Sequence, residues 1–217
     1  MKSSKPFHLE PILKVQEVNE PSPLPFAKKS YRERLEALEE LRELYRVLPT
    51  NSQNVLTEDP SSYPGFSLQD VVTTLVSQEV EFILIGRYAV AFHGYPRFTH
   101  DLDLYIHPTQ ENAKRIVSAF EQLGFKHPEL TIEGLLKPNG VYKIGKVPHQ
   151  LELLNEVKGI SWDEARSTAI SENLFGQKVY FLNLDTLIKS KKAAGRLQDL
   201  ADVEQLERIR RDSWLND

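Results

Sequence analysis

The chain has 217 residues, of which 40% are hydrophobic, and this is enough for one sizeable domain with a buried core and an extension. It contains no cysteine, which excludes disulfides and thiolate metal sites. Its 27 basic and 31 acidic residues leave a net charge of −4, which excludes a general electrostatic attraction to nucleic acid. No run of residues approaches the ~20 apolar residues of a membrane span or the core of a signal peptide, so we expect a cytoplasmic protein without membrane contact.

Residues 1–66 are predicted to form an N-terminal extension in three parts. Residues 1–29 contain several prolines and no sustained periodicity, which indicates an extended arm. An amphipathic helix is expected next. Residues 49–65 are rich in Ser, Asn, Thr and Pro and are typical of a linker to the following domain.

The helix of this extension is predicted over residues 30–48. Ser30 and Glu33 have the spacing of a capping box, and the leucines that follow recur at helical spacing. Such an apolar stripe must be buried against something. Two interpretations are open: the stripe packs on the rest of the chain, or it mediates self-association or the docking of a partner protein.

Residues 67–217 are predicted to form a second domain in which helices and strands alternate. We expect helices that begin at Ser67, Thr109 and Ser161 and C-terminal helices over residues 184–213; strands over residues 81–86, 99–106 and 178–182; and strands joined by turns over residues 130–155. This order predicts an α/β (α+β) fold, with a small mixed β-sheet flanked by helices.

Asp101 and Asp103 are two residues apart in the predicted strand 99–106, so both carboxylates project from the same face of that strand. Two like charges this close are costly without a cation between them. Mg²⁺ prefers carboxylate oxygens together with substrate phosphates, and a pair of such ions can hold the attacking and leaving oxygens of a phosphoryl transfer. The alternative interpretation is a solvated pair of surface acids.

A strand, a glycine turn and a short helix precede this acidic strand. Residues 81–86 are apolar and end in Gly86, and residues 87–93 follow a helical pattern. Such a turn directs backbone N–H groups toward a bound anion, and glycine allows a phosphate to approach the backbone closely. The sequence therefore predicts a phosphate-binding turn just before the metal site.

The segment GRYAVAFHGYPRFTHDLDLYI resembles the core motif of minimal nucleotidyltransferases of the DNA polymerase beta superfamily, and the similarity extends over roughly residues 68–210. The resemblance implies a polymerase-beta-like palm that transfers a nucleoside monophosphate from an NTP to a hydroxyl of RNA or protein and releases pyrophosphate. It also implies two Mg²⁺ or Mn²⁺ ions. Asp101, Asp103 and a third acid on a later strand, Glu152, would be the catalytic metal ligands.

The same resemblance implies a set of nucleotide-binding residues, although the chain departs from the family in two places. Arg87 occupies a position where the family usually has a small residue, and its side chain could either fill the phosphate pocket or bind the phosphates as a bidentate donor. The third acid is glutamate instead of aspartate. The implied nucleotide-binding residues are Gly86, Arg87, Arg97, Thr99, Lys191 and Lys192, of which Arg97 and Thr99 would either brace the acidic strand or touch phosphate.

A second interpretation comes from a different class of protein. Minimal nucleotidyltransferases are often one half of a toxin–antitoxin pair, so the resemblance also allows a catalytically weak or inactive module that binds a partner. Arg87 and the leucine-striped helix of residues 30–48 motivate this alternative. Metal-dependent binding of NTP separates the enzyme from the module.

Overall fold

The computed structural model describes residues 24–47, 67–97, 99, 101–128, 130–144 and 150–214. The helices are α1 (Leu24–Ala27), α2 (Tyr31–Val47), α3 (Leu68–Ser77), α4 (Gly86–Phe92), α5 (Gln110–Gln122), α6 (Ile132–Leu135), α7 (Trp162–Thr168), α8 (Leu184–Ala194) and α9 (Leu197–Trp214). The strands are β1 (Phe82–Leu84), β2 (Asp101–Ile106), β3 (Val141–Ile144), β4 (Gln150–Leu154), β5 (Ile170–Leu174) and β6 (Gln177–Phe181). Among the described helices, none is long and apolar enough to cross a membrane.

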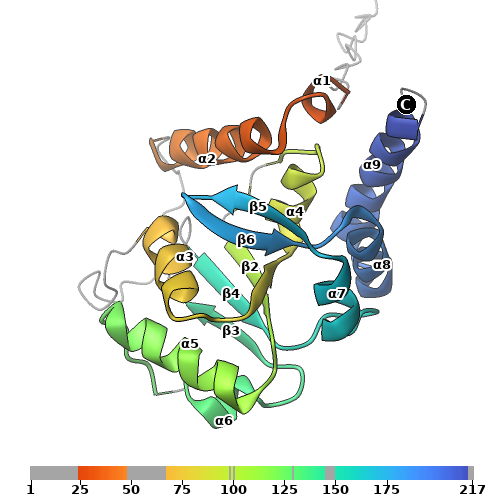
Figure 1. The fold of residues 1–217 in the computed structure, drawn as a ribbon. Helices are drawn as coiled ribbons and strands as arrows, with labels where there is room; N and C mark the ends of the chain where they lie inside the picture. The colour runs from red at the N-terminus through yellow and green to blue at the C-terminus, as the bar shows by residue number, and fades with distance from the viewer. Residues whose placement is uncertain are drawn as a thin grey trace, which may run out of the picture.

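Six strands of the described residues form one mixed sheet, in the order β3-β4-β2-β1-β6-β5. The pairs β1–β6 and β2–β4 are parallel, whereas the pairs β1–β2, β3–β4 and β5–β6 are antiparallel. Helices α3 and α5 lie on one side of this sheet, and α7 and α8 lie on the other (Figure 1). The predicted α/β (α+β) fold with a mixed sheet flanked by helices is therefore confirmed.

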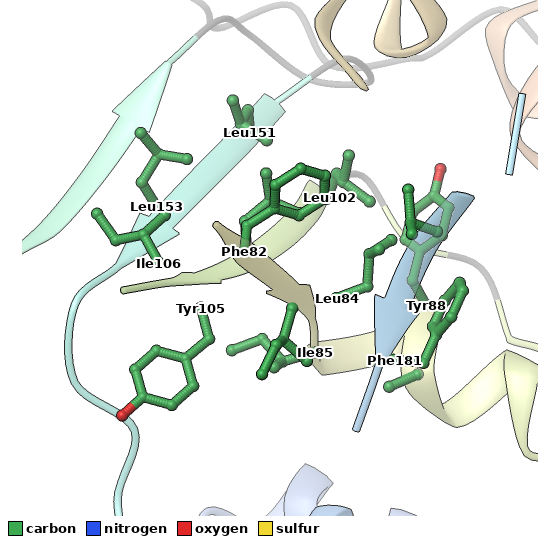
Figure 2. Packing of buried hydrophobic residues seen from close by; sticks show 14 of the residues in the cluster. Phe82, Leu84, Ile85, Tyr88, Leu102, Tyr105, Ile106, Leu151, Leu153 and Phe181 are labelled. Atoms are coloured by element: carbon green, nitrogen blue, oxygen red, sulfur yellow. The ribbon is translucent and has the colours of Figure 1, made fainter. Parts of the chain in front are cut away.

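The central strands separate an apolar face from a polar one. Leu102, Leu151 and Leu153 are at most 1% exposed, and Figure 2 shows them on one side of β2 and β4, with Tyr105 on the other. Because side chains alternate along a strand, Asp103 shares the face of Tyr105. Each fully buried leucine stabilises the fold by about 1.5–3 kcal/mol, so the apolar face fixes which way the acids point.

The predicted N-caps are present. Ser67 and Asp70 form a reciprocal capping box at the start of α3, and the Thr109 side chain accepts a hydrogen bond from the Asn112 N–H at the start of α5. Ser30 also forms the predicted box, because its N–H donates to a Glu33 carboxylate oxygen at 2.7 Å. These caps satisfy N–H groups that a helix start leaves without a partner.

Helix α2 packs on the chain's own domain, against α4 and β5. Leu35 and Leu38 are 4% and 0% exposed, and Arg34 Nη1 donates to the Phe92 carbonyl at 2.8 Å. For Leu35 and Leu38 the structure shows the first of the two interpretations, in which the leucine stripe packs on the rest of the chain. The end of the predicted helix at Leu48 and the predicted linker at residues 49–65 lie outside the described residues.

The predicted extended arm of residues 1–29 is wrong where the structure describes it. Residues Leu24–Ala27 form the short helix α1, and residues 1–23 lie outside the described part. Pro25 is compatible with this helix because a first turn needs no hydrogen bond from its N–H groups. The Arg34 guanidinium also donates to the Ala27 carbonyl, seven residues earlier in the chain.

Two further elements differ from the sequence predictions. Residues 130–155 are predicted to form strands joined by turns, but Ile132–Leu135 form helix α6, where the Thr131 hydroxyl accepts from the Gly134 N–H at 3.0 Å. Strand β5 was missed because Ile170–Leu174 is polar at its three central positions. Its pairing with β6 depends on a tight turn in which Phe175 and Gly176 both have positive φ, of 54° and 78°, without the Asn-Gly signal that predicts such turns.

Candidate functional site

The pairing of β2 with β4 brings the third acid to the predicted pair. In this parallel register Asp103 lies beside Glu152, and Asp101 lies beside Gln150. Residues paired in register project from the same face of a sheet. One carboxylate oxygen from each of Asp101, Asp103 and Glu152 lies within 4.8 Å of the others. These three residues are called the acidic cluster below.

The electrostatics of the acidic cluster favour a cation. Burial, followed by the charges of Asp101 and Glu152, raises the pKa of Asp103 to about 7, although Lys191 and Arg87 act in the opposite direction. The positive charges of the protein therefore do not fully balance the negative charge of the ionised Asp103 carboxylate. Three converging carboxylates supply the hard oxygen ligands that Mg²⁺ and Mn²⁺ prefer, so the residues present fit such an ion.

Two of the predicted nucleotide-binding residues contact Asp101. The buried Thr99 hydroxyl donates to Asp101 Oδ1 at 2.5 Å. Arg87 Nη1 lies 3.9 Å from the same oxygen, and its Nη2 donates to Gln198 Oε1 at 3.2 Å. Both side chains thus orient Asp101, and Arg87 supplies a positive charge at the edge of the acidic cluster.

Glu152 has a cationic neighbour that the sequence analysis missed. In the antiparallel β3–β4 register Lys143 pairs with Glu152, and its Nζ lies 2.7 Å from Glu152 Oε1. The Lys143 side chain is 61% exposed. The only signal for this contact would have been the register of the hairpin, which sequence alternation alone does not set.

Gly86 is required by its contact with the acidic cluster. It has a φ of +59°, and a β-carbon at this position would lie 1.8 Å from Asp103 Oδ2. Any other residue would therefore be strained in its backbone and would displace the Asp103 carboxylate. The sequence predicts Gly86 as a point of phosphate approach, and its contact with Asp103 is a second reason for glycine at this position.

A cavity of about 400 Å³ opens beside these residues. Gly86, Asp103 and Glu152 line it from the sheet, while Lys191 and Arg196 line it from α8 and the turn that follows. The structure therefore brings residues that are about 100 positions apart in the chain to one hollow. Arg97, Thr99 and Lys192 do not line this cavity.

Lys191 lies in a buried ion network at the wall of the cavity. Its side chain is 8% exposed, and its Nζ donates to Asp199 at 3.1 Å and to Asp202 at 2.7 Å. Arg97 donates twice to Asp202, both times at 2.7 Å, through Nε and Nη2. Arg196 Nε donates to Asp199 at 2.6 Å. These five residues are called the ion network below.

The ion network compensates its own charges. Burial would raise the pKa of Asp199, but hydrogen bonds from Arg196 and Lys191 outweigh this effect and lower the pKa below its usual value. Asp199 and Asp202 were not predicted as site residues, because their hydrogen bonds with Lys191 and Arg97 depend on how α9 packs. Lys192 instead points to Glu207, at 2.6 Å, with its side chain 54% exposed.

No protein-family model matches the chain, and no curated protein matches it. Among solved structures, the chain is similar to TM1012 from Thermotoga maritima, a provisionally assigned nucleotidyltransferase, with 19% identity, a TM-score of 0.41, and coverage of 69% of this chain and 90% of that one. It is also similar to the lincomycin-bound lincosamide antibiotic adenylyltransferase LnuA, with 13% identity, a TM-score of 0.45, and coverage of 65% of this chain and 95% of that one.

Proposed function

We propose that this protein is a metal-dependent nucleotidyltransferase, which transfers a nucleoside monophosphate from an NTP to an acceptor hydroxyl. The observation that carries the proposal is the convergence of Asp101, Asp103 and Glu152 within 4.8 Å of one another, beside a cavity of about 400 Å³ that Lys191 and Arg196 also line. Acids alone would suit many cation sites. Acids that converge at a cavity large enough for a ligand suit an ion that binds together with phosphates.

The residues would divide the work between holding the ion and holding the nucleotide. Asp101, Asp103 and Glu152 would hold Mg²⁺ or Mn²⁺. Thr99 and Arg87 would keep Asp101 in place. A bound ion would neutralise phosphate charge and align the reacting groups. Gly86 and Lys191 line the cavity and would contact phosphate. The hydrogen bond from Thr99 to Asp101 supports bracing of the acidic strand, whereas Arg97 donates to Asp202 on α9 instead.

The transfer exchanges one phosphorus–oxygen bond for another. The acceptor oxygen forms a bond to the α-phosphorus, while the bond from that phosphorus to the oxygen bridging to the β-phosphorus breaks. The bonding pair leaves with pyrophosphate, and the hydroxyl proton passes to the Glu152 carboxylate. Positioning of the reactants and charge neutralisation supply most of the catalysis in such reactions.

The size of the domain supports the minimal form of such an enzyme. The sheet, the acidic cluster and the ion network all lie within residues 67–214. The alternative of an inactive module was motivated partly by the leucine stripe of α2, but Leu35 and Leu38 are buried against the domain itself. Burial of these two leucines therefore removes part of one reason for that alternative.

Calorimetry with a non-cleavable NTP analogue, whose α–β bridging oxygen is replaced by methylene, tests the proposal without knowledge of the acceptor. We expect binding to require Mn²⁺ or Mg²⁺ and to weaken more than about a hundredfold in Asp103→Asn. Glu172→Gln, which removes a carboxylate from β5 at the far end of the sheet, is the matched control and should bind normally. Metal-independent binding would favour the inactive module, and the absence of binding to any common NTP analogue would contradict the proposal.

The transfer itself is tested with α-labelled NTPs and pools of cellular RNA and protein. Mass spectrometry of the labelled product would report the added nucleotide and its attachment site. Transfer by the wild type that is lost in Asp103→Asn supports the proposal. Equal label with both proteins would mean that the acidic cluster takes no part in the reaction.

A further inference from the structure

A hollow of about 960 Å³ lies between helix α2 and strand β5, at the end of the sheet opposite β3 (Figure 1). Residues of α2 between Arg32 and Glu40 line one wall, and residues 172–176 of β5 and the following turn line the other. None of the described residues that line this hollow also lines the cavity beside the acidic cluster. It is therefore a separate feature, called the α2–β5 groove below.

Strand β5 presents a free edge to this groove. Among the described residues β5 is the last strand of the sheet and pairs with β6. Leu174 and Gln177 flank a two-residue turn, so they form a hydrogen-bonded pair, and the pairs alternate from there. The backbone groups of Ser171 and Asn173 therefore point away from β6. The Asn173 N–H indeed donates to the Glu172 carboxylate at 2.9 Å. Such an edge can accept one further strand.

The least exposed residues that line the α2–β5 groove are apolar. Leu35 and Leu174 are each 4% exposed, and Phe175, in the turn, is half-buried. The groove thus combines a helix on one side, an edge strand on the other and apolar side chains between them. Domains that bind extended peptides by strand addition have this combination, in which main-chain hydrogen bonds give affinity and the side-chain contacts give specificity.

The charges of the lining indicate which kind of strand would fit. The charged residues are Glu36, Glu39 and Glu40 on α2, Glu172 on β5, and Arg32 as the base among them. Arg32 already contacts Glu36, with 2.7 Å between Nε and Oε1. Acids therefore outnumber bases in the lining, and the groove is complementary to a cationic segment.

Two other occupants are disfavoured by the same acids. A second copy that paired its own β5 with this β5 would bring the glutamates of both grooves together, and like charges opposed across strands are destabilising. Nucleic acid would bring its phosphates against these carboxylates. Lys178 does not offset Glu172, because it pairs in register with Asn173 and so lies on the other face of the hairpin.

We propose that the α2–β5 groove binds an extended, basic segment of a partner protein, which joins the sheet as a strand beside β5. Its main chain hydrogen-bonds with the outward groups of Ser171 and Asn173, and the Asn173 N–H exchanges the Glu172 carboxylate for the new strand. Lysine or arginine side chains on the α2 side contact Glu39 and Glu40. The site uses the acidic face of α2 and not its buried leucine stripe, and it does not depend on the proposed nucleotidyltransferase function.

The first test is fluorescence anisotropy of the full chain with a labelled peptide of roughly seven residues, alternating lysine and valine, which is long enough to span β5. We expect binding that weakens with rising salt, and an alternating glutamate and valine peptide should bind at least about tenfold more weakly. Glu36→Lys and Glu40→Lys should each weaken binding about tenfold. Both residues are exposed, so the fold should persist.

Glu133→Lys is the matched control, because it reverses the same charge on the exposed surface of α6, near β3 at the other end of the sheet (Figure 1). It should leave binding of the lysine and valine peptide unchanged. If Glu133→Lys weakens binding as much as Glu40→Lys does, the peptide is attracted by overall charge and the proposal is wrong. Equal affinity for the lysine and glutamate peptides would overturn it as well.

Strand addition is tested separately from charge with two peptides of the same sequence, one N-methylated at every lysine and one at every valine. Only one of these alternate sets of N–H groups can point toward β5, so one methylated peptide should bind normally and the other about tenfold more weakly. Equal affinities of the two would overturn strand addition, since a peptide held by its charges alone does not distinguish them.

Ser171→Pro tests the same point from the side of the protein. It removes an outward N–H while the hydrogen bonds between β5 and β6 do not need that group. We expect peptide binding to weaken about tenfold while the far-ultraviolet circular dichroism spectrum is retained. If sedimentation shows the wild type to be a dimer that Ser171→Pro converts to a monomer, a second copy occupies the groove and the proposal is overturned.

Discussion

The acidic cluster and the ion network lie at the same cavity and use the same kinds of charged residue, but their charges are balanced differently. In the ion network, two carboxylates are hydrogen-bonded by three cationic side chains, and the pKa of Asp199 is lowered. In the acidic cluster, burial and the neighbouring acids raise the pKa of Asp103 to about 7. In the first arrangement each carboxylate has cationic partners, whereas the second arrangement needs a further positive charge.

This difference separates a structural role from a binding role. Removing one member of a compensated buried network leaves its partners unpaired, which is a cost to folding. Removing one member of a like-charge cluster relieves repulsion, which favours folding but removes a ligand. The same substitution, an acid replaced by a neutral residue, should therefore have opposite effects on stability in the two regions.

The largest effect on stability is expected for Asp202→Ala. Asp202 is 1% exposed, and its loss leaves Lys191 and Arg97 without their shared carboxylate, which should lower the free energy of unfolding by about 3–5 kcal/mol. Urea denaturation measures the change. Asp185→Ala is the control, because its carboxylate is 75% exposed and pairs with Arg210, a contact worth about 0–1 kcal/mol. Equal losses in both variants would mean that the ion network contributes no more than a surface pair.

The second prediction concerns pH and Asp103. Because its pKa is about 7 in the folded protein and about 3.9 in an unfolded chain, the unfolded state releases this proton first as pH rises. Without metal, stability should therefore fall between about pH 4 and pH 7, by on the order of 3–4 kcal/mol. Asp103→Asn should remove this loss and be more stable than the wild type at pH 8.

The same proton competes with the metal. Mn²⁺ affinity should increase by up to about tenfold per pH unit as pH approaches 7, and should level off above that value. Titrations of Mn²⁺ at several pH values, monitored by electron paramagnetic resonance, measure this dependence. Affinity that does not change between pH 5.5 and 7 would contradict the raised pKa of Asp103.

The third prediction separates backbone strain from contact with the acidic cluster. Gly86 and Gly176 have φ values of +59° and +78°, but an added β-carbon would meet Asp103 only at Gly86, and nothing within 4 Å at Gly176. Both alanine variants should lose about 1–2 kcal/mol from the left-handed backbone. Gly86→Ala alone should also weaken Mn²⁺ binding, since the Asp103 carboxylate must move. If the two variants bind Mn²⁺ equally well, the contact between Gly86 and Asp103 has no role in the site.

The smallest effect is expected for Lys192→Ala. Lys192 pairs with Glu207 on the exposed side of α8, so its loss should change stability by no more than about 1 kcal/mol. Binding of the NTP analogue should remain unchanged as well, because Lys192 does not line the cavity. A clear loss of NTP affinity would instead support the nucleotide-binding role that the resemblance implies for Lys192.

Local patterns predicted the elements that carry the site, but not the partners of its side chains. Alternation placed Asp101 and Asp103 on one face of a strand, and capping residues located the starts of α2, α3 and α5. Helix α6 and strand β5 were missed because both are short and are stabilised by contacts with other elements. The same limit applies to Lys191, whose partners Asp199 and Asp202 lie beyond the turn between α8 and α9.

The sequence by itself determined that this protein has a mixed sheet flanked by helices, with two aspartates on one face of a strand, because side-chain spacing within a strand or helix is a local property of the backbone. The tertiary structure decided that Glu152 joins them, that Lys143 contacts Glu152, and that Lys191 lies in a compensated network. Those outcomes depend on strand register and on the packing of α8 and α9, because burial raises the free energy of an ionised side chain that has no partner.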